Sequence, residues 1–283
     1  MLLNSGSQNK VLALFCILLL VGCDKTLFYD NSSREEAIYK DTFEYLCSPT
    51  LEGKAAGSNG SKLAAEFIIS SIHNKSNIIR EKFIHEGLEL ENILVSIPGD
   101  VDSTVIVGAH YDSYPSYNNV FLPGADDNVS GVSILINLVN QLSETKLKYN
   151  ILFAFWDAEE IGRYGSKYYL SRTCDNILFY INLDTCGSSS TYKLGFLYDG
   201  EHPETVHLLD DLDTYNIFQV NEYVPTSYTT DCEFFKQYNL PFVSISPMTL
   251  PQYMHKGSDT PDIINYKRLY QINTIIHQML MSL

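Results

Sequence analysis

Basic residues are scarce in this chain, and they are not clustered. Its 283 residues contain 19 lysines and arginines against 34 aspartates and glutamates, which gives a formal net charge of −15. No segment gathers enough positive charge to follow a phosphate backbone, so nucleic acid is not an expected partner. Bound divalent cations would offset several carboxylates locally, and the acidic excess is therefore compatible with metal sites.

Cysteine pairs with the spacing of a zinc knuckle or a thioredoxin motif are also absent. The six cysteines are Cys16, Cys23, Cys47, Cys174, Cys186 and Cys232. Without such spacing, a structural zinc ion on sulfur is disfavoured. The last four cysteines could form two disulfides in an oxidising compartment, in any of about three pairings, or could remain isolated buried thiols. The sequence leaves both possibilities open.

The apolar stretch near the N-terminus is too short for a comfortable membrane span. Residues 11–22 follow Lys10 and suit the core of a signal peptide. They end in Leu20-Val21-Gly22-Cys23, which resembles a bacterial lipobox, in which the cysteine is lipidated. We therefore expect a signal peptide at 1–22, a tether at 23–34 anchored to a membrane through lipidated Cys23, and export to the bacterial cell envelope. An ordinary cleaved signal or an uncleaved anchor helix is the alternative.

Internal repeats and interdomain linkers are not found after residue 34, so a single domain is expected over 35–283. Helices are expected at 34–46, 61–72, 130–142, 165–171, 203–215, 231–238 and 266–281. Strands are expected at 78–85, 88–97, 104–109, 150–155, 176–183, 192–197 and 241–245. This alternation predicts an α/β fold, with a mixed and mostly parallel β-sheet between layers of helices.

Several of the expected strands and junctions end in side chains that can bind a metal ion. The candidates are His110, the pair Asp126–Asp127, the pair Glu159–Glu160, Asp184 and His255. Because the carboxyl ends of strands share one edge of an open α/β sheet, these residues can converge although they are far apart in the sequence. Two imidazoles with several carboxylates suit zinc better than magnesium or calcium, and the set is large enough for two metal ions. Within this set, Asp127 is expected, with its neighbour Asn128, to begin a helix and cap its free N–H groups.

Two further aspartates could support the ligands. Asp112 lies two residues after His110 and could orient the imidazole ring, and Asp259 could support the loop that carries His255.

Five ordered motifs together resemble the co-catalytic dizinc aminopeptidases, a family of zinc exopeptidases that also has carboxypeptidase and glutaminyl cyclase relatives. The motifs are Gly108-Ala-His110-Tyr-Asp112-Ser, Pro123-Gly-Ala-Asp126-Asp127-Asn-Val-Ser-Gly131, Ala158-Glu159-Glu160-Ile-Gly, Asn182-Leu-Asp184 and His255-Lys-Gly-Ser-Asp259-Thr-Pro. The resemblance extends from about residue 51 to the C-terminus.

This resemblance implies two zinc ions and a role for each ligand. By motif, Asp126 would bridge the two ions, His110 and Asp184 would complete one site, and the other site would be completed by Glu160 and His255. The implied activity is that of an exopeptidase, most simply an aminopeptidase that hydrolyses the N-terminal bonds of peptide substrates.

The resemblance also implies a role for Glu159. It would be the general base that takes a proton from a metal-bridging water and passes it to the leaving amine. The chain departs from the family pattern at Thr230-Asp231-Cys232, where Ser-Asp-His is frequent. Tyr228, just before this segment, is a candidate donor to the tetrahedral oxyanion, with an ordinary loop tyrosine as the alternative.

Two other functions compete with this prediction. Glutaminyl cyclases resemble the chain around Asp126, Glu160 and His255 but typically use one zinc ion, and the presence of both His110 and Asp184 favours the two-metal hydrolase. A non-catalytic, peptide-binding lipoprotein would be expected to have lost the base or a ligand, and none is lost. Substrate preference and oligomeric state are not encoded in these motifs.

Overall fold

The computed structural model describes residues 27–75, 77–116, 120–188, 193–198, 202–221 and 229–283. The predicted signal peptide, Cys23 and Tyr228 lie outside these ranges. No helix within them is both long enough and apolar enough to cross a membrane.

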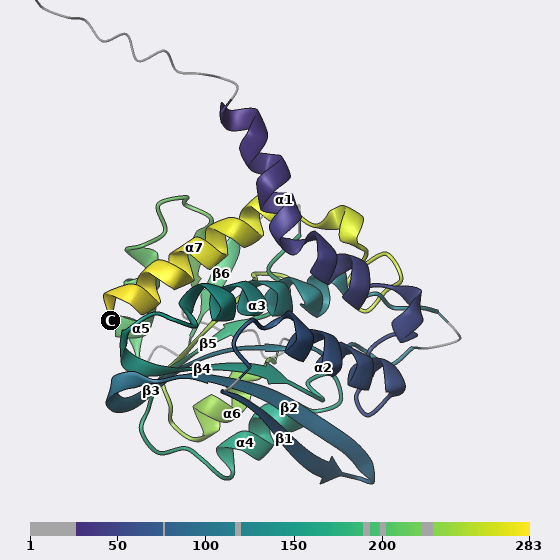
Figure 1. Ribbon diagram of the computed structural model, residues 1–283, viewed down its shortest axis with the longest axis horizontal. Helices are drawn as coiled ribbons and strands as arrows, with labels where there is room; N and C mark the ends of the chain where they lie inside the picture. The colour runs from purple at the N-terminus through teal and green to yellow at the C-terminus, as the bar shows by residue number, and fades with distance from the viewer. Residues whose placement is uncertain (1–26, 76, 117–119, 189–192, 199–201, 222–228) are drawn as a thin grey trace, which may run out of the picture.

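A mixed β-sheet forms the centre of the molecule (Figure 1). Its strands are β1 (Ile78–His85), β2 (Leu88–Ile97), β3 (Gly99–His110), β4 (Leu147–Trp156), β5 (Ile177–Leu183), β6 (Leu194–Leu197), β7 (Phe218–Asn221) and β8 (Phe242–Pro247). In space the order is β1-β2-β4-β3-β5-β8-β6-β7. The central strands β4, β3, β5 and β8 are mutually parallel, whereas β2 pairs antiparallel with β4 and β6 pairs antiparallel with β8, at the two sides of this group. The predicted fold class is confirmed.

Helices cover both faces of the sheet. They are α1 (Leu27–Leu46), α2 (Asn59–Ser71), α3 (Ser130–Leu142), α4 (Tyr164–Leu170), α5 (Pro203–Asp210), α6 (Cys232–Gln237) and α7 (Tyr266–Ser282). Figure 1 shows α1, α2, α3, α5 and α7 on one side of the sheet, and α4 with α6 on the other. Two short 3-10 helices, Pro49–Leu51 and Pro261–Ile263, lie in the connections.

Alternate side chains of the central strands fill two cores, one on each face of the sheet. In β3, Val105 and Val107 pack against the larger helical layer, whereas Ile106 packs against the layer of α4 and α6. This alternation follows from the pleat of a β-strand, which points successive side chains to opposite faces. Trp156, the last residue of β4, is buried in the second core, where its Nε1 donates a hydrogen bond to Tyr180 Oη at 3.0 Å.

Four elements differ most from the sequence-based expectations, among them β3, which begins at Gly99 rather than at residue 104. The first helix begins at Leu27 rather than at residue 34, so it includes most of the segment expected to be a tether. α5 ends at Asp210, because Asp213 accepts hydrogen bonds from the N–H groups of Ile217 and Phe218 and so stabilises a turn. β7 was not predicted, since four residues at the edge of the sheet carry little periodic signal.

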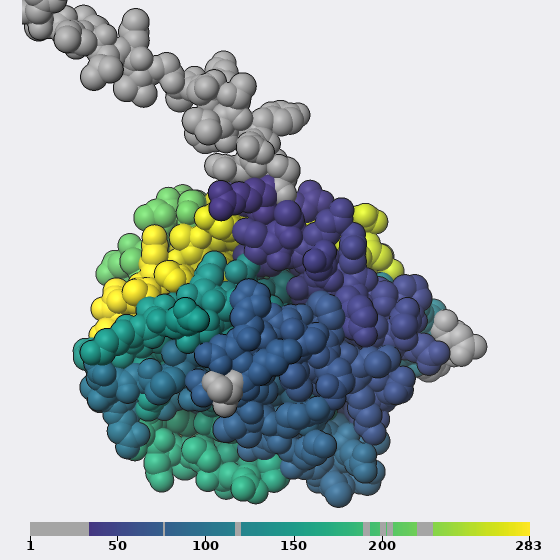
Figure 2. All heavy atoms as spheres, in the orientation of Figure 1, coloured from purple at the N-terminus to yellow at the C-terminus, as the bar shows by residue number. Residues whose placement is uncertain are grey.

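The first and last helices lie beside each other. Tyr39, Phe43 and Leu46 of α1 are buried, and the rings of Phe43 and Tyr266 meet edge to face at 5.4 Å. In Figure 2 the purple surface of α1 adjoins the yellow surface of the C-terminal helix. The helix that precedes the sheet is therefore packed into the core from Tyr39 onward.

The four cysteines of the described residues are unpaired. Cys47, Cys186 and Cys232 are buried, and Cys174 is exposed. Of the two possibilities left by the sequence, the structure shows free thiols.

Candidate active site

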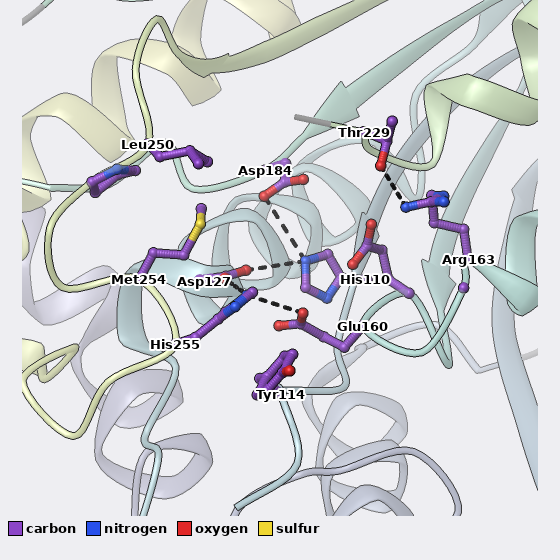
Figure 3. Close-up of a pocket in the computed structure, with 13 residues that line it drawn as sticks. His110, Tyr114, Asp127, Glu160, Arg163, Asp184, Thr229, Leu250, Met254 and His255 are labelled. Carbon is purple, nitrogen blue, oxygen red and sulfur yellow. Dashed lines mark hydrogen bonds and ion pairs between the residues drawn. The ribbon is translucent and has the colours of Figure 1, made fainter. Parts of the chain in front are cut away.

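Four neighbouring strands bring the candidate residues to one edge of the sheet. His110 ends β3, the Glu159–Glu160 pair follows β4, Asp184 follows β5, and His255 lies in the loop after β8. Because these strands are parallel and adjacent, their carboxyl ends lie together. The five side chains line one cavity of about 400 Å³ (Figure 3).

Asp127 lies between the two histidines. Its Oδ1 is 3.3 Å from His110 Nε2, and its Oδ2 is 3.1 Å from His255 Nε2. Glu160 Oε2 is 3.0 Å from His255 Nε2, and Asp184 Oδ1 is 3.9 Å from His110 Nε2. One carboxylate thus connects two histidine–carboxylate pairs (Figure 3).

Asp126, the aspartate predicted to connect the pairs, has other partners. Its Oδ1 accepts the Gly187 N–H at 2.5 Å, and its Oδ2 accepts the Tyr253 hydroxyl at 2.5 Å. The structure therefore corrects the sequence prediction, in which Asp127 was a helix cap and Asp126 the bridge. Two adjacent carboxylates in a turn point in different directions, and the local sequence does not say which of them faces the cavity.

A glycine and a buried carboxylate hold the turn that presents Asp127. Gly124 has a left-handed φ of 61°, and a Cβ at this position would lie 2.4 Å from the Asp127 carbonyl oxygen, so the turn requires glycine. Asp259 accepts the N–H groups of Asp126 at 2.8 Å and Asp127 at 3.1 Å. The sequence predicted that Asp259 supports the loop of His255. In the structure, its carboxylate binds the N–H groups of the Asp127 turn.

Two buried atoms of the cluster have no hydrogen-bond partner among the described residues. They are His110 Nε2 and Glu160 Oε1. Together with Asp127, these residues offer ligand atoms that all lie within 4.8 Å of one another. Buried polar atoms are rarely left unpaired, and imidazole nitrogen with carboxylate oxygen is a donor set that zinc accepts. The residues therefore fit a bound zinc ion.

Asp112 accepts hydrogen bonds from the backbone of both adjacent glutamates, Glu159 and Glu160. Its Oδ1 accepts the Glu159 N–H at 3.0 Å, and its Oδ2 accepts the Glu160 N–H at 3.2 Å. The same Oδ1 is 3.5 Å from His110 Nδ1, and that nitrogen is 3.2 Å from the Asp112 carbonyl oxygen. Asp112 therefore contacts the histidine, as expected, and also positions the glutamates, which was not foreseen.

Glu159 lines the cavity and belongs to neither of the two histidine–carboxylate pairs, which are His110–Asp184 and His255–Glu160. It is 8% exposed, and burial raises the pKa of its carboxyl well above the usual range, although nearby His110 opposes the shift. A cation bound beside it would lower that pKa again. Glu159 is thus a carboxyl group whose proton affinity can fall in the range needed for proton transfer.

Protonation of the histidines compensates for the acidity of the cluster. Burial opposes the charging of His255, but Asp127 and Glu160 outweigh it and raise the pKa of the imidazole to about 10. Burial raises the pKa of Glu160 to about 7. For Asp127, burial is outweighed by His110 and His255, which hold the pKa well below its usual range. Positive charge is therefore required between these carboxylates, from protons or from metal ions.

Lys54 is a buried charged residue that sequence reasoning did not identify. It is 1% exposed, its Nζ donates to the Pro123 carbonyl oxygen at 2.7 Å, and its backbone N–H donates to Ser113 Oγ at 2.9 Å. Burial lowers its pKa, and Asp259 and Asp127 oppose that shift. Its position in a turn-rich stretch gave no signal that it would be enclosed.

The segment around the predicted oxyanion donor is described only in part. Tyr228 is outside the described residues, but its neighbour Thr229 lines the cavity and accepts a hydrogen bond from Arg163 Nη1 at 2.7 Å. Asp231 is buried and accepts the Ser166 hydroxyl at 2.6 Å.

Curated relatives match part of this chain. A probable leucine aminopeptidase 2 from Arthroderma benhamiae is 29% identical over 148 residues, which cover 50% of this chain and 28% of the relative. A probable lipoprotein aminopeptidase from Mycobacterium tuberculosis, LpqL, is 35% identical over 108 residues, which cover 36% of this chain and 20% of the relative. The chain thus spans less than a third of the length of either relative.

Solved structures share the fold over most of the chain. A leucine aminopeptidase precursor from Bacteroides thetaiotaomicron superposes with a TM-score of 0.74 at 16% identity, covering 89% of this chain and 97% of that one. A glutaminyl cyclase from Porphyromonas gingivalis superposes with a TM-score of 0.72 at 19% identity, covering 88% and 98%. At these identities the likeness establishes the fold alone.

The family is established by a match along the sequence itself. Residues 92–280 match the model of peptidase family M28, and this range contains every cavity residue discussed above. The chain belongs to peptidase family M28.

Proposed function

We propose that this chain is a zinc-dependent exopeptidase, an aminopeptidase that hydrolyses the N-terminal bonds of peptides. The observation that carries the proposal is the position of Asp127, whose two oxygens reach His110 and His255 beside a separate, buried Glu159. This arrangement joins two potential metal sites through one carboxylate and leaves a carboxyl group free for proton transfer.

Two zinc ions are proposed per chain. His110 and Asp184 would hold one ion, Glu160 and His255 the other, and Asp127 would be shared. When bound, zinc polarises a carbonyl group and makes water more acidic. The shared ligand is the reason for proposing a pair of ions, because a carboxylate with an imidazole at each oxygen is placed to contact both.

Glu159 is proposed as the general base and then the general acid. Its side chain would take a proton from the attacking water and donate it to the nitrogen of the leaving peptide. The hydrogen bond from its backbone N–H to Asp112 holds the residue at the cavity wall.

Metal content measured together with two activities tests this proposal. The protein purified with zinc should contain about two ions per chain by elemental mass spectrometry and should release N-terminal amino acids from peptides. One ion per chain, with cyclisation of N-terminal glutamine and no release of amino acids, would establish the glutaminyl cyclase alternative instead. The glutaminyl cyclase alternative is supported by the fold, which a glutaminyl cyclase shares.

We also propose that the chain is exported and anchored to the cell envelope through lipid on Cys23. The proposal rests on the lipobox-like residues 20–23 after an apolar run, and a relative is described as a lipoprotein aminopeptidase. Expression in a bacterial host should give a membrane-bound, lipidated form. The Cys23→Ala variant should remain unlipidated, and equal lipidation of both forms would exclude this anchor.

A further inference from the structure

The cavity has a charged end and an apolar end. Figure 3 shows Arg163 and Thr229 on one side of the histidine–carboxylate cluster, and Leu250 with Met254 on the other. Apart from the two imidazoles, Arg163 is the only cationic side chain among the described residues that line the cavity. The other charged side chains of the lining are four carboxylates and the two imidazoles, which belong to the proposed metal and proton-transfer site.

Two partners hold the Arg163 guanidinium in place. Its Nη1 donates to Thr229 Oγ1 at 2.7 Å, and its Nη2 is 2.9 Å from Glu233 Oε2 of α6. Its backbone N–H donates to the Glu159 carbonyl oxygen at 2.8 Å, so one turn carries both the proposed base and the arginine. The guanidinium is therefore fixed relative to the site of cleavage.

These contacts leave part of the guanidinium unused. The side chain is 23% exposed, although its Nε is fully buried and cannot reach a ligand in the cavity. A guanidinium carries about five N–H donors in a planar fork that matches a carboxylate. Thr229 and Glu233 each contact one terminal nitrogen, and each terminal nitrogen carries about two N–H groups, so donors on Nη1 and Nη2 remain for a ligand in the cavity.

We propose that Arg163 forms a subsite for a carboxylate of the substrate, held in orientation by Thr229 and Glu233. The carboxylate would be either the acidic side chain of the N-terminal residue or the free C-terminus of a dipeptide. This specificity rests on the proposed aminopeptidase function, and it narrows the substrates to peptides with a negative charge next to the cleaved bond.

Matched substrate pairs test the subsite in the unaltered zinc-loaded chain. The first arm compares the release of the N-terminal residue from Glu-Ala-Ala-amide and from Gln-Ala-Ala-amide. The second compares Leu-Ala with Leu-Ala-amide. In one arm, kcat/KM should be higher for the carboxylate than for the neutral amide by about tenfold or more, and added salt should reduce the ratio. A preference in the first arm assigns the bound carboxylate to the N-terminal side chain. A preference in the second arm assigns it to the C-terminus of the dipeptide.

Variants then assign the preference to Arg163. Arg163→Leu should bring the ratio in that arm close to one, Arg163→Lys should keep part of it, and Arg163→Glu should favour Lys-Ala-Ala-amide over Glu-Ala-Ala-amide. The matched control is Arg172→Leu, because Arg172 is an exposed arginine outside the cavity whose Nη1 contacts the Tyr168 hydroxyl. This control should keep the ratio of the unaltered chain.

Several results would overturn the subsite. One is equal rates within both substrate pairs, and another is a ratio that survives in Arg163→Leu. If that variant does not fold, a ratio unaffected by salt in the unaltered chain, or unchanged in Arg163→Lys, has the same meaning. By contrast, a zinc-loaded chain that releases no amino acid even from Leu-Ala-amide would contradict the aminopeptidase proposal itself.

Discussion

Adjacent acidic residues at this edge of the sheet have different binding partners. In the Asp126–Asp127 pair, one carboxylate meets both histidines and the other is bound by Gly187 and Tyr253. In the pair Glu159–Glu160, the Glu160 carboxylate contacts His255, and Glu159 lines the cavity outside that contact. Chemically identical neighbours therefore differ only in direction, and direction is set by the turns that carry them.

Substitution of each aspartate distinguishes their roles. Asp127→Asn should reduce zinc content sharply, because the residue lies between both histidines. Asp126→Asn should retain zinc, since an amide oxygen can still accept the Gly187 N–H. Elemental analysis of both purified variants is the measurement. Loss of zinc from Asp126→Asn with retention in Asp127→Asn would restore the assignment predicted from the sequence.

Replacement of Glu159 should separate chemistry from metal binding. Glu159→Gln keeps the size of the side chain but removes the proton carrier, so kcat should fall by about 10²–10⁴-fold. Zinc content should stay that of the unaltered chain, because Glu159 is in neither histidine pair. Full activity in a zinc-loaded Glu159→Gln protein would show that Glu159 is not the general base.

At the scale of elements, loops after different strands are tied to one another behind the cavity. Asp259 binds the N–H groups of the Asp127 turn, Asp112 binds those of the glutamate turn, and Lys54 joins the Ser113 and Pro123 segments. Each tie is a buried charged group with hydrogen-bond partners, which makes the arrangement costly to distort. The geometry of the cavity is thus supported by residues that do not line it.

Removal of Lys54 should destabilise the fold. Lys54→Met leaves the Pro123 carbonyl oxygen without its donor and the nearby aspartates without a cation, so the free energy of unfolding should fall by about 3–5 kcal/mol. Urea titration measures this value. Lys62→Met is the matched control, because Lys62 is an exposed lysine whose side chain is 58% exposed, and it should change stability by about 0.5 kcal/mol or less. Similar losses in both variants would contradict the importance of Lys54.

At the scale of the whole molecule, the negative charge is concentrated where cations are expected. The formal charge of the chain is −15, and within the described residues four carboxylates of the cavity lie beside only two imidazoles and one arginine. Without metal ions, protons must supply the missing positive charge, as the raised pKa values of His255 and Glu160 indicate. Metal and protons therefore compete for the same positions.

Zinc affinity should rise with pH. Zinc binds deprotonated ligands, and the metal-free His255, with a pKa of about 10, and Glu160, with a pKa of about 7, must lose protons on binding. Affinity should thus increase from about pH 6 toward pH 10, most steeply below pH 7, where both groups carry protons. Titration calorimetry in buffers of different ionisation enthalpy should detect this proton release at neutral pH. A pH-independent affinity without proton release would contradict the proposed ligands.

The sequence by itself determined the α/β class, nearly all helices and strands, and the edge of the sheet at which function is expected. These features follow from hydrophobic periodicity and from the motifs at strand ends, which are local properties. Helix α3, for example, was predicted at the bounds it has in the structure, Ser130–Leu142.

Only the tertiary structure decided which carboxylates point into the cavity and what holds them there. Asp127 rather than Asp126 faces the histidines, because the direction of each side chain depends on a turn fixed by Gly124 and Asp259. Asp259 lies 132 positions from Asp127 in the sequence. Lys54 and Arg163 were missed for the same reason, since burial and cavity position arise from contacts between distant segments. A local pattern specifies residue types and spacing, whereas the orientation of a side chain is set by all the elements packed around it.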